Sequence, residues 1–141
     1  MEQKQSSSSF TLSILASPAR TWQSLTREVD AFWPDDMLTL GPTAQPALEP
    51  QIGGRLYEYR PDGAGALLAT IIEILPETSL SLQTTAAPHA VSLVTITLGP
   101  TALAGTSLTL TLTGGSADSL GWWRRLLESG LKPYLEAPRT A

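Results

Sequence analysis

His89 is the only histidine of the chain, and there is no cysteine, so few residues could serve as nucleophile, base or metal ligand. His89 follows Pro88 between two predicted strands. In a catalytic triad a carboxylate orients the histidine beside a nucleophile, and the chain contains no G-x-S-x-G segment. We therefore expect His89 to be an exposed loop residue, and we predict no catalytic residue.

The acidic residues do not predict a metal site either. Asp35 and Asp36 are the only adjacent carboxylates, and one histidine with no cysteine gives few ligands for a zinc site. A solvated turn is expected there. Gly63-Ala64-Gly65 precedes a predicted strand, whereas a dinucleotide-binding glycine motif opens a helix. This segment is therefore interpreted as a hairpin turn, and no metal or cofactor is predicted.

Glu58 stands between Arg55 and Arg60 in a predicted strand. Because side chains alternate across a strand, Glu58 shares a face with Leu56, and Tyr57 and Tyr59 share the other. A surface ion pair is the favoured interpretation of Glu58. A carboxylate that anchors the polar end of a ligand inside a pocket stays open as the alternative.

The order of elements follows from the spacing of apolar residues. Alternation of apolar and polar residues predicts strands, most clearly where leucine and threonine alternate, and Ser17-Pro18 is typical of a helix start. The segment 41–50, with Gly41 and three prolines, is interpreted as an extended connection or irregular edge. The predicted strands are 10–14, 55–60, 67–75, 80–82, 94–98 and 108–113, and the predicted short helices are 19–25 and 28–33.

The last element is a long amphipathic helix capped by Ser116 or Asp118. Its apolar residues, including Trp122 and Leu126, cover more than half of the helix circumference at 100° per residue. So wide an apolar face suits a helix that a sheet wraps on most sides. Gly130 lies within that face, where glycine permits close approach to the sheet or to a ligand, and Pro133 should bend the last turns.

The totals fit one domain. The chain has 141 residues and a net charge of −4, which argues against a nucleic-acid surface. The longest apolar stretch, 66–75, is broken by Thr70 and Glu73, and a membrane span needs about 20 apolar residues. We expect a disordered tail over 1–9, a single domain over 10–137 and a cytoplasmic location, because no apolar signal core is present.

Several local motifs resemble the START-like superfamily, also called SRPBCC or helix-grip proteins. Within it the chain is similar to the bacterial branch named after the activator of heat-shock-protein-90 ATPase. The segment 49–58, EPQIGGRLYE, matches the pattern "ep.vGGr.yE". Further matches are Ser17-Pro18 with Trp22 and Leu25, Phe32-Trp33-Pro34, Asp62-Gly63, Gly105-Thr106 and Gly121-Trp122.

The resemblance covers about residues 10–136 and implies an α+β, helix-grip fold. In such a fold a curved antiparallel sheet of about six to seven strands wraps around the long C-terminal helix, with two short helices after the first strand. Four positions depart from the family pattern. Together they imply a pocket more apolar than usual; they are Ala69, Pro76, Thr84 and Leu112.

Mid-sized apolar residues on the inward face of the sheet predict a small-molecule pocket, although the same residues could close into a dry core. The cavity lining we predict consists of Trp33, Tyr57, Tyr59, Ile72, Ile74, Val94, Ile96, Leu108, Leu110, Leu112, Trp122 and Leu126.

The favoured function is non-catalytic binding of a hydrophobic or aromatic small molecule. Two alternatives stay open. One is a protein-interaction or homodimer module that uses the Ser/Thr sheet face, or an exposed strand edge, from residue 79 onward. The other is a cyclase-, aromatase- or hydrolase-like enzyme that uses Tyr57, Tyr59, Glu58 and Arg60.

Overall fold

The computed structural model describes residues 7–85 and 91–137. In these ranges seven strands form one antiparallel sheet in the order β1-β7-β6-β5-β4-β3-β2. Strands β2 to β7 form a meander, and β1 pairs with β7 at one edge of the sheet. The strands are β1 (Ser7–Ile14), β2 (Gln45–Leu48), β3 (Arg55–Tyr59), β4 (Gly65–Leu75), β5 (Ser79–Thr84), β6 (Ser92–Pro100) and β7 (Thr106–Gly114).

The two outer strands differ most from the sequence-based expectation. β1 begins at Ser7 rather than Phe10, since Ser7, Ser8 and Ser9 pair with residues 111–113 of β7 without burying any apolar group. β2 forms within the segment 41–50 and pairs with β3 alone. A strand at a sheet edge tolerates proline, and Pro46 lies in β2.

Two register shifts change which side chains of β4 face inward. One falls between Leu56 and Tyr57 in the β3–β4 pairing, and the other between Ile71 and Glu73 in the β4–β5 pairing. A bulge adds a residue to one strand and reverses the alternation beyond it. Ile71 is consequently buried, while Ile72 is 47% exposed.

Short helices connect β1 to β2. They are α1 (Pro18–Arg27), α2 (Val29–Phe32) and the 3-10 turn η1 (Asp35–Met37). The Ser17 side chain accepts a hydrogen bond from the Arg20 N–H and caps α1, as the Ser17-Pro18 pair predicts.

The C-terminal helix runs from α3 (Ala117–Arg125) through a π-helical segment, η2 (Leu126–Leu131), into α4 (Lys132–Glu136). Ser116 is its N-cap, because the Ser116 and Ser119 hydroxyls each accept a hydrogen bond from the other's backbone N–H. Pro133 has no N–H with which to close an α-helical turn, and the wider π-helical turns lie immediately before α4.

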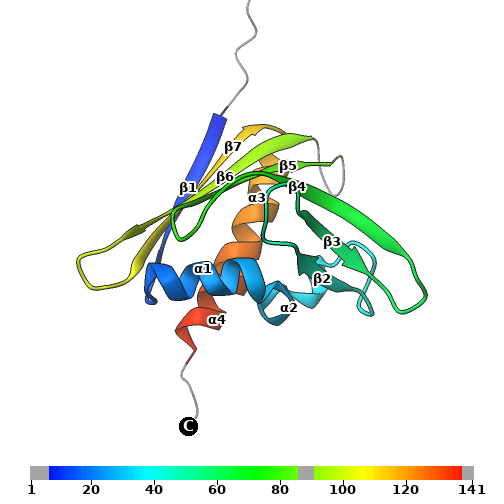
Figure 1. Ribbon diagram of the computed structural model, residues 1–141, viewed down its shortest axis with the longest axis horizontal. Coiled ribbons are helices and arrows are strands. Elements are labelled where there is room, and N and C mark those ends of the chain that lie inside the picture. The colour runs from blue at the N-terminus through cyan, green and yellow to red at the C-terminus, as the bar shows by residue number, and fades with distance from the viewer. Residues whose placement is uncertain (1–6, 86–90, 138–141) are drawn as a thin grey trace, which may run out of the picture.

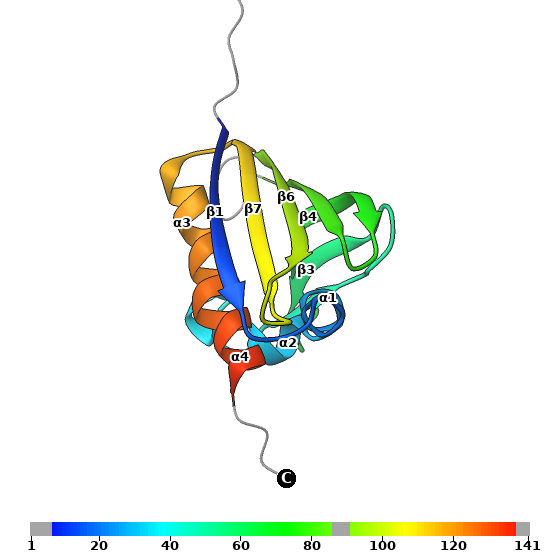
Figure 2. The same ribbon diagram turned by 90° about the vertical axis from the view of Figure 1, so that its left-hand side faces the viewer.

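The sheet arches over the C-terminal helix, and α1 and α2 lie across the open side of the arch (Figure 1). In the orthogonal view the C-terminal helix runs along the sheet close to β1 (Figure 2). The predicted α+β helix-grip architecture is therefore confirmed. No helix in the described ranges is long and apolar enough to cross a membrane.

Candidate functional site

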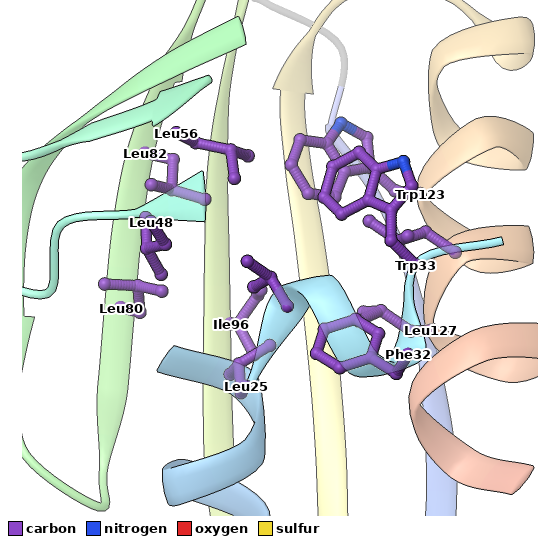
Figure 3. Close-up of a pocket in the computed structure, with 12 residues that line it drawn as sticks. Leu25, Phe32, Trp33, Leu48, Leu56, Leu80, Leu82, Ile96, Trp123 and Leu127 are labelled. Atoms are coloured by element: carbon purple, nitrogen blue, oxygen red, sulfur yellow. The ribbon is translucent and has the colours of Figure 1, made fainter. Parts of the chain in front are cut away.

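A small apolar cavity lies where the sheet, the C-terminal helix and α2 meet (Figure 3). Its volume is about 20 Å³. Every residue of its wall is apolar, and the wall draws on α1, α2, β2, β3, β5, β6 and the C-terminal helix. The wall residues are Leu25, Val29, Phe32, Trp33, Leu48, Leu56, Leu80, Leu82, Ile96, Trp123, Leu126 and Leu127.

The volume of this cavity limits the size of the molecule that can enter it without a movement of the wall. A cavity needs roughly 10–15 Å³ to accept one water molecule, and a cavity of about 150 Å³ accepts benzene. An organic ligand therefore requires the wall to move outward. Water has little reason to enter, because the wall offers it few polar partners.

Among the wall residues, Trp33 has a polar atom, the indole Nε1, that is buried without a partner in the part of the chain that the structure describes. Trp33 is 6% exposed, and its Nε1–H is buried without a hydrogen-bond acceptor among the described residues. The ring packs edge-on against Trp122, with centroids 5.7 Å apart. An unsatisfied buried donor costs about 1–3 kcal/mol, so an acceptor brought to this point would remove a penalty that the protein carries.

Three of the predicted lining residues, Trp33, Ile96 and Leu126, belong to the cavity wall. Trp122 is half-buried and contacts Trp33 and Trp123. Four more are fully buried in the core but lie outside the wall. These four are Val94, Leu108, Leu110 and Leu112.

The structure places the remaining predicted lining residues away from the cavity. Tyr57 and Tyr59 lie on the face of β3 opposite the buried Leu56, and Tyr59 is 44% exposed. Ile72 faces outward because of the β4 bulge, and Ile74 is half-buried against the core. The two tyrosines and Ile72 therefore have no part in the wall.

Most of the wall was not predicted. Leu56 could have been found by choosing the strand face opposite the tyrosines, and Leu80 and Leu82 by their alternation with serines. Residues of α1, α2 and β2 give no such signal, because only the tertiary fold brings those elements over the sheet. This second group comprises Leu25, Val29, Phe32 and Leu48.

Glu58 is fully buried, so the predicted surface ion pair is wrong. Its carboxylate accepts hydrogen bonds from the backbone N–H groups of Thr39 (2.7 Å) and Leu40 (2.9 Å). Both oxygens are thereby used to fix the connection between η1 and β2. Glu58 shares the inward face of β3 with Leu56, as the alternation of side chains predicts, but its acceptor role depends on a loop 18 residues away in sequence.

The two neighbouring arginines pair elsewhere. Arg60 binds Asp62, and Arg55 binds Glu49 through its side chain and its backbone N–H. These bonds from Arg55, the side-chain bonds first, lower the pKa of Glu49 to about 2. The arrangement closes the turn that carries Gly53 and Gly54.

A polar network joins α1 to α4 at the helical side of the molecule. The Glu28 Oε1 accepts hydrogen bonds from Arg20 (2.9 Å), Ser24 (3.0 Å) and the Tyr134 hydroxyl (2.8 Å). Burial raises the pKa of Glu28, but the bonds from Arg20, Tyr134 and Ser24 outweigh it, and the pKa lies below its ordinary value. The network holds α1 against the end of the C-terminal helix.

Asp35 and Asp36, considered from the sequence as a metal site, lie outside the cavity wall. Asp36 pairs with Arg125. His89 lies outside the described residues. Within 7–85 and 91–137 no three histidine, cysteine or acidic side chains are grouped as metal ligands would be.

The sheet edges also differ from the expectation. The strands after residue 79, β5, β6 and β7, each have a neighbour on both sides. They therefore offer no exposed edge. The edge strands are β1 and β2.

No protein-family model matches the sequence, and no curated protein matches it either. Solved structures do. A protein from Mesorhizobium loti superposes with a TM-score of 0.69 at 21% identity, covering 96% of this chain and 100% of that one. The Aha1 dimer from Colwellia psychrerythraea gives 0.67 at 18% identity, covering 96% and 99%.

An AHSA1-like protein from Aeromonas hydrophila gives a TM-score of 0.68 at 16% identity, again covering 96% of this chain and 99% of that one. At these identities the comparisons establish the fold. The chain has the helix-grip fold of the Aha1-like and AHSA1-like proteins, as the motifs along its sequence predict.

Proposed function

We propose that the protein binds an apolar or aromatic small molecule, without catalysis, in the space between the sheet and the C-terminal helix. The observation that carries this proposal is the cavity wall built from apolar and aromatic residues, one of which, Trp33, has a buried N–H without an acceptor among the described residues. A ligand gains about 25 cal/mol for each Å² of apolar surface that it buries there. A ligand oxygen near the indole would also satisfy the Trp33 donor.

The composition of the wall supports binding rather than chemistry. General acid–base catalysis needs a titratable group within hydrogen-bonding reach of the substrate. The cavity wall has none, and the two oxygens of Glu58 already accept backbone hydrogen bonds. Tyr57 and Tyr59 lie on the face of β3 opposite Leu56 and outside the cavity wall, which favours binding over catalysis.

Binding requires the cavity to widen, and the wall has elements suited to that movement. β2 has four residues and a single strand neighbour, and such weakly held segments open at low free-energy cost. Leu48 of β2 belongs to the wall. Displacement of β2 therefore enlarges the cavity while the β4–β7 part of the sheet keeps its pairing.

The experiment is a titration with N-phenyl-1-naphthylamine, an uncharged probe that fluoresces in apolar surroundings. We expect saturable binding to the native protein. Leu80→Phe fills the cavity and should abolish binding, whereas Leu110→Phe adds the same volume in the core outside the wall and should leave it. Circular dichroism confirms that both variants are folded. Absence of saturable binding to the native protein refutes the proposal.

A second candidate is association with a protein partner or a second copy through the edge of β1. The Ser13 carbonyl and the Leu15 N–H point away from β7, because they bond to Lys132 and Glu136 of α4. By alternation the backbone groups of Ser9 and Thr11 also face away from β7. The similar Colwellia psychrerythraea protein is a dimer.

This candidate is tested by light scattering coupled to size-exclusion chromatography. We expect a dimer at high protein concentration, and Ser9→Pro should shift it to monomer because proline removes an outward donor. A native protein that stays monomeric at all concentrations would exclude self-association.

A further inference from the structure

A second hollow adjoins the interior cavity on its outer side. It is a groove of about 190 Å³ between the end of α1, α2 and the edge strand β2. In contrast to the cavity, its wall is largely polar at the rim. The groove is lined by Thr26, Arg27, Val29, Asp30, Gln45, Pro46, Ala47, Leu48 and Tyr59.

Val29 and Leu48 belong to the walls of both hollows. Val29 is buried and Leu48 is half-buried, so these two side chains stand between the polar groove and the apolar interior. Leu48 lies on β2, whose outer side has no strand partner. A shift of this short strand would join the two hollows into one continuous channel.

Arg27 differs from the other cations of the described ranges. It is exposed, and its guanidinium makes no ion pair or hydrogen bond with any residue in 7–85 or 91–137. Six others are paired with carboxylates, namely Arg20, Arg55, Arg60, Arg124, Arg125 and Lys132. The free guanidinium therefore lies at the rim of a groove that leads toward an apolar space.

We propose that this groove is the mouth of the interior site and that the ligand is an amphipathic carboxylate, whose apolar part passes Val29 and Leu48 while its carboxylate binds Arg27. A guanidinium matches a carboxylate with two parallel hydrogen bonds. This inference rests on the proposed function and adds the charge of the ligand and its route.

Other polar groups of the groove affect how strongly it favours a carboxylate over an uncharged ligand. Asp30 is exposed on the same rim and carries the opposite charge. The Tyr59 hydroxyl donates to the Gln45 side-chain oxygen at 3.2 Å, which uses the Tyr59 proton and fixes the Gln45 amide at the groove. Arg27 attracts the carboxylate and Asp30 repels it, so the two substitutions should act in opposite directions.

The test compares decanoate with 1-decanol, which share the apolar chain and differ in charge, as competitors of N-phenyl-1-naphthylamine. Arg27→Gln should weaken decanoate binding about fivefold, the upper range for an exposed ion pair, and leave decanol binding unchanged. Asp30→Asn should strengthen decanoate binding alone. Arg124→Gln removes the same charge from α3, outside the groove, and should change neither.

The outcomes separate the two proposals. If neither competitor displaces the probe and the probe itself does not bind, the proposed function fails. If both displace it but Arg27→Gln leaves the decanoate affinity unchanged, the interior site stands and the role assigned to the groove is overturned. Loss of the Arg27 effect in about 1 M salt would agree with an exposed ion pair.

Discussion

Gly130 of the C-terminal helix passes so close to Phe32 that a methyl group on its Cα would lie 2.6 Å from the Phe32 carbonyl oxygen. The contact brings the helix against the segment that carries Trp33. It also explains why glycine stands in the apolar face of a helix, where the sequence predicted close approach to the sheet or to a ligand. The partner is α2 rather than the sheet.

Gly130→Ala should therefore destabilise the protein. Overpacking of a tight contact costs about 1–3 kcal/mol, which exceeds the gain of roughly 1 kcal/mol in helix propensity. Urea unfolding monitored by circular dichroism measures the difference. Gly121→Ala is the matched control, because nothing lies within 4 Å of its added methyl group, and we expect that variant to be more stable than the native protein. Equal stabilisation by both substitutions would contradict the contact.

Glu58→Gln should lower the free energy of unfolding by about 1.5–3 kcal/mol, the range for hydrogen bonds to a charged group. The amide has only one oxygen, so it cannot accept from both Thr39 and Leu40. Glu73→Gln on the exposed side of β4 provides the control. Hydrogen exchange at the Thr39 and Leu40 amides should accelerate in Glu58→Gln alone, and unchanged exchange there would argue against the assigned role.

The Glu49–Arg55 pair makes a contribution to stability that depends on pH. The native pKa of Glu49 is about 2, against 4.5 ordinarily, so the unfolded chain binds the proton more tightly. The contribution is fully present above pH 4.5 and is lost as the pH falls toward 2. We expect the stability difference between native protein and Glu49→Gln to shrink over that interval. A difference that stays constant from pH 5 to 2.5 would show that Glu49 is unpaired in solution.

Leu126→Ala should enlarge the existing cavity rather than create a separate one. The substitution costs about 2–5 kcal/mol, and the widened apolar space should admit benzene, which then raises the melting temperature of the variant. Leu75→Ala, an exposed position at the end of β4, should change stability by no more than about 0.5 kcal/mol and show no response to benzene. If benzene leaves the melting temperature of Leu126→Ala unchanged, the neighbouring side chains have collapsed into the space left by Leu126, and the prediction is wrong.

The sequence was sufficient for the architecture because local patterns specify it. Aliphatic residues that alternate with threonine define β6 and β7, Ser17 and Pro18 start α1, and the long apolar face of the last helix implies a sheet around it. The motif at 49–58 gave the family resemblance, and the solved structures confirm its fold.

The site was predicted less well, for two physical reasons. Bulges in β4 move Ile71 inward and Ile72 outward, and alternation alone cannot place a bulge. The wall also includes Val29 and Leu48, whose positions depend on how the connection between β1 and β2 folds back over the sheet. Glu58 illustrates the same limit, since its partners lie in that connection.

The most direct test of the central claim is an NMR titration of protein labelled with nitrogen-15 and with carbon-13 at its methyl groups, using 1-acetonaphthone, an aromatic ligand with one carbonyl acceptor. The chain has four tryptophans, and Trp33→Phe identifies the Trp33 indole signal among them. Ligand binding in the interior predicts a downfield shift of that signal, together with shifts of the Leu80, Leu82 and Ile96 methyl groups. Saturating ligand that leaves the Trp33 signal and those methyl signals in place would contradict the account.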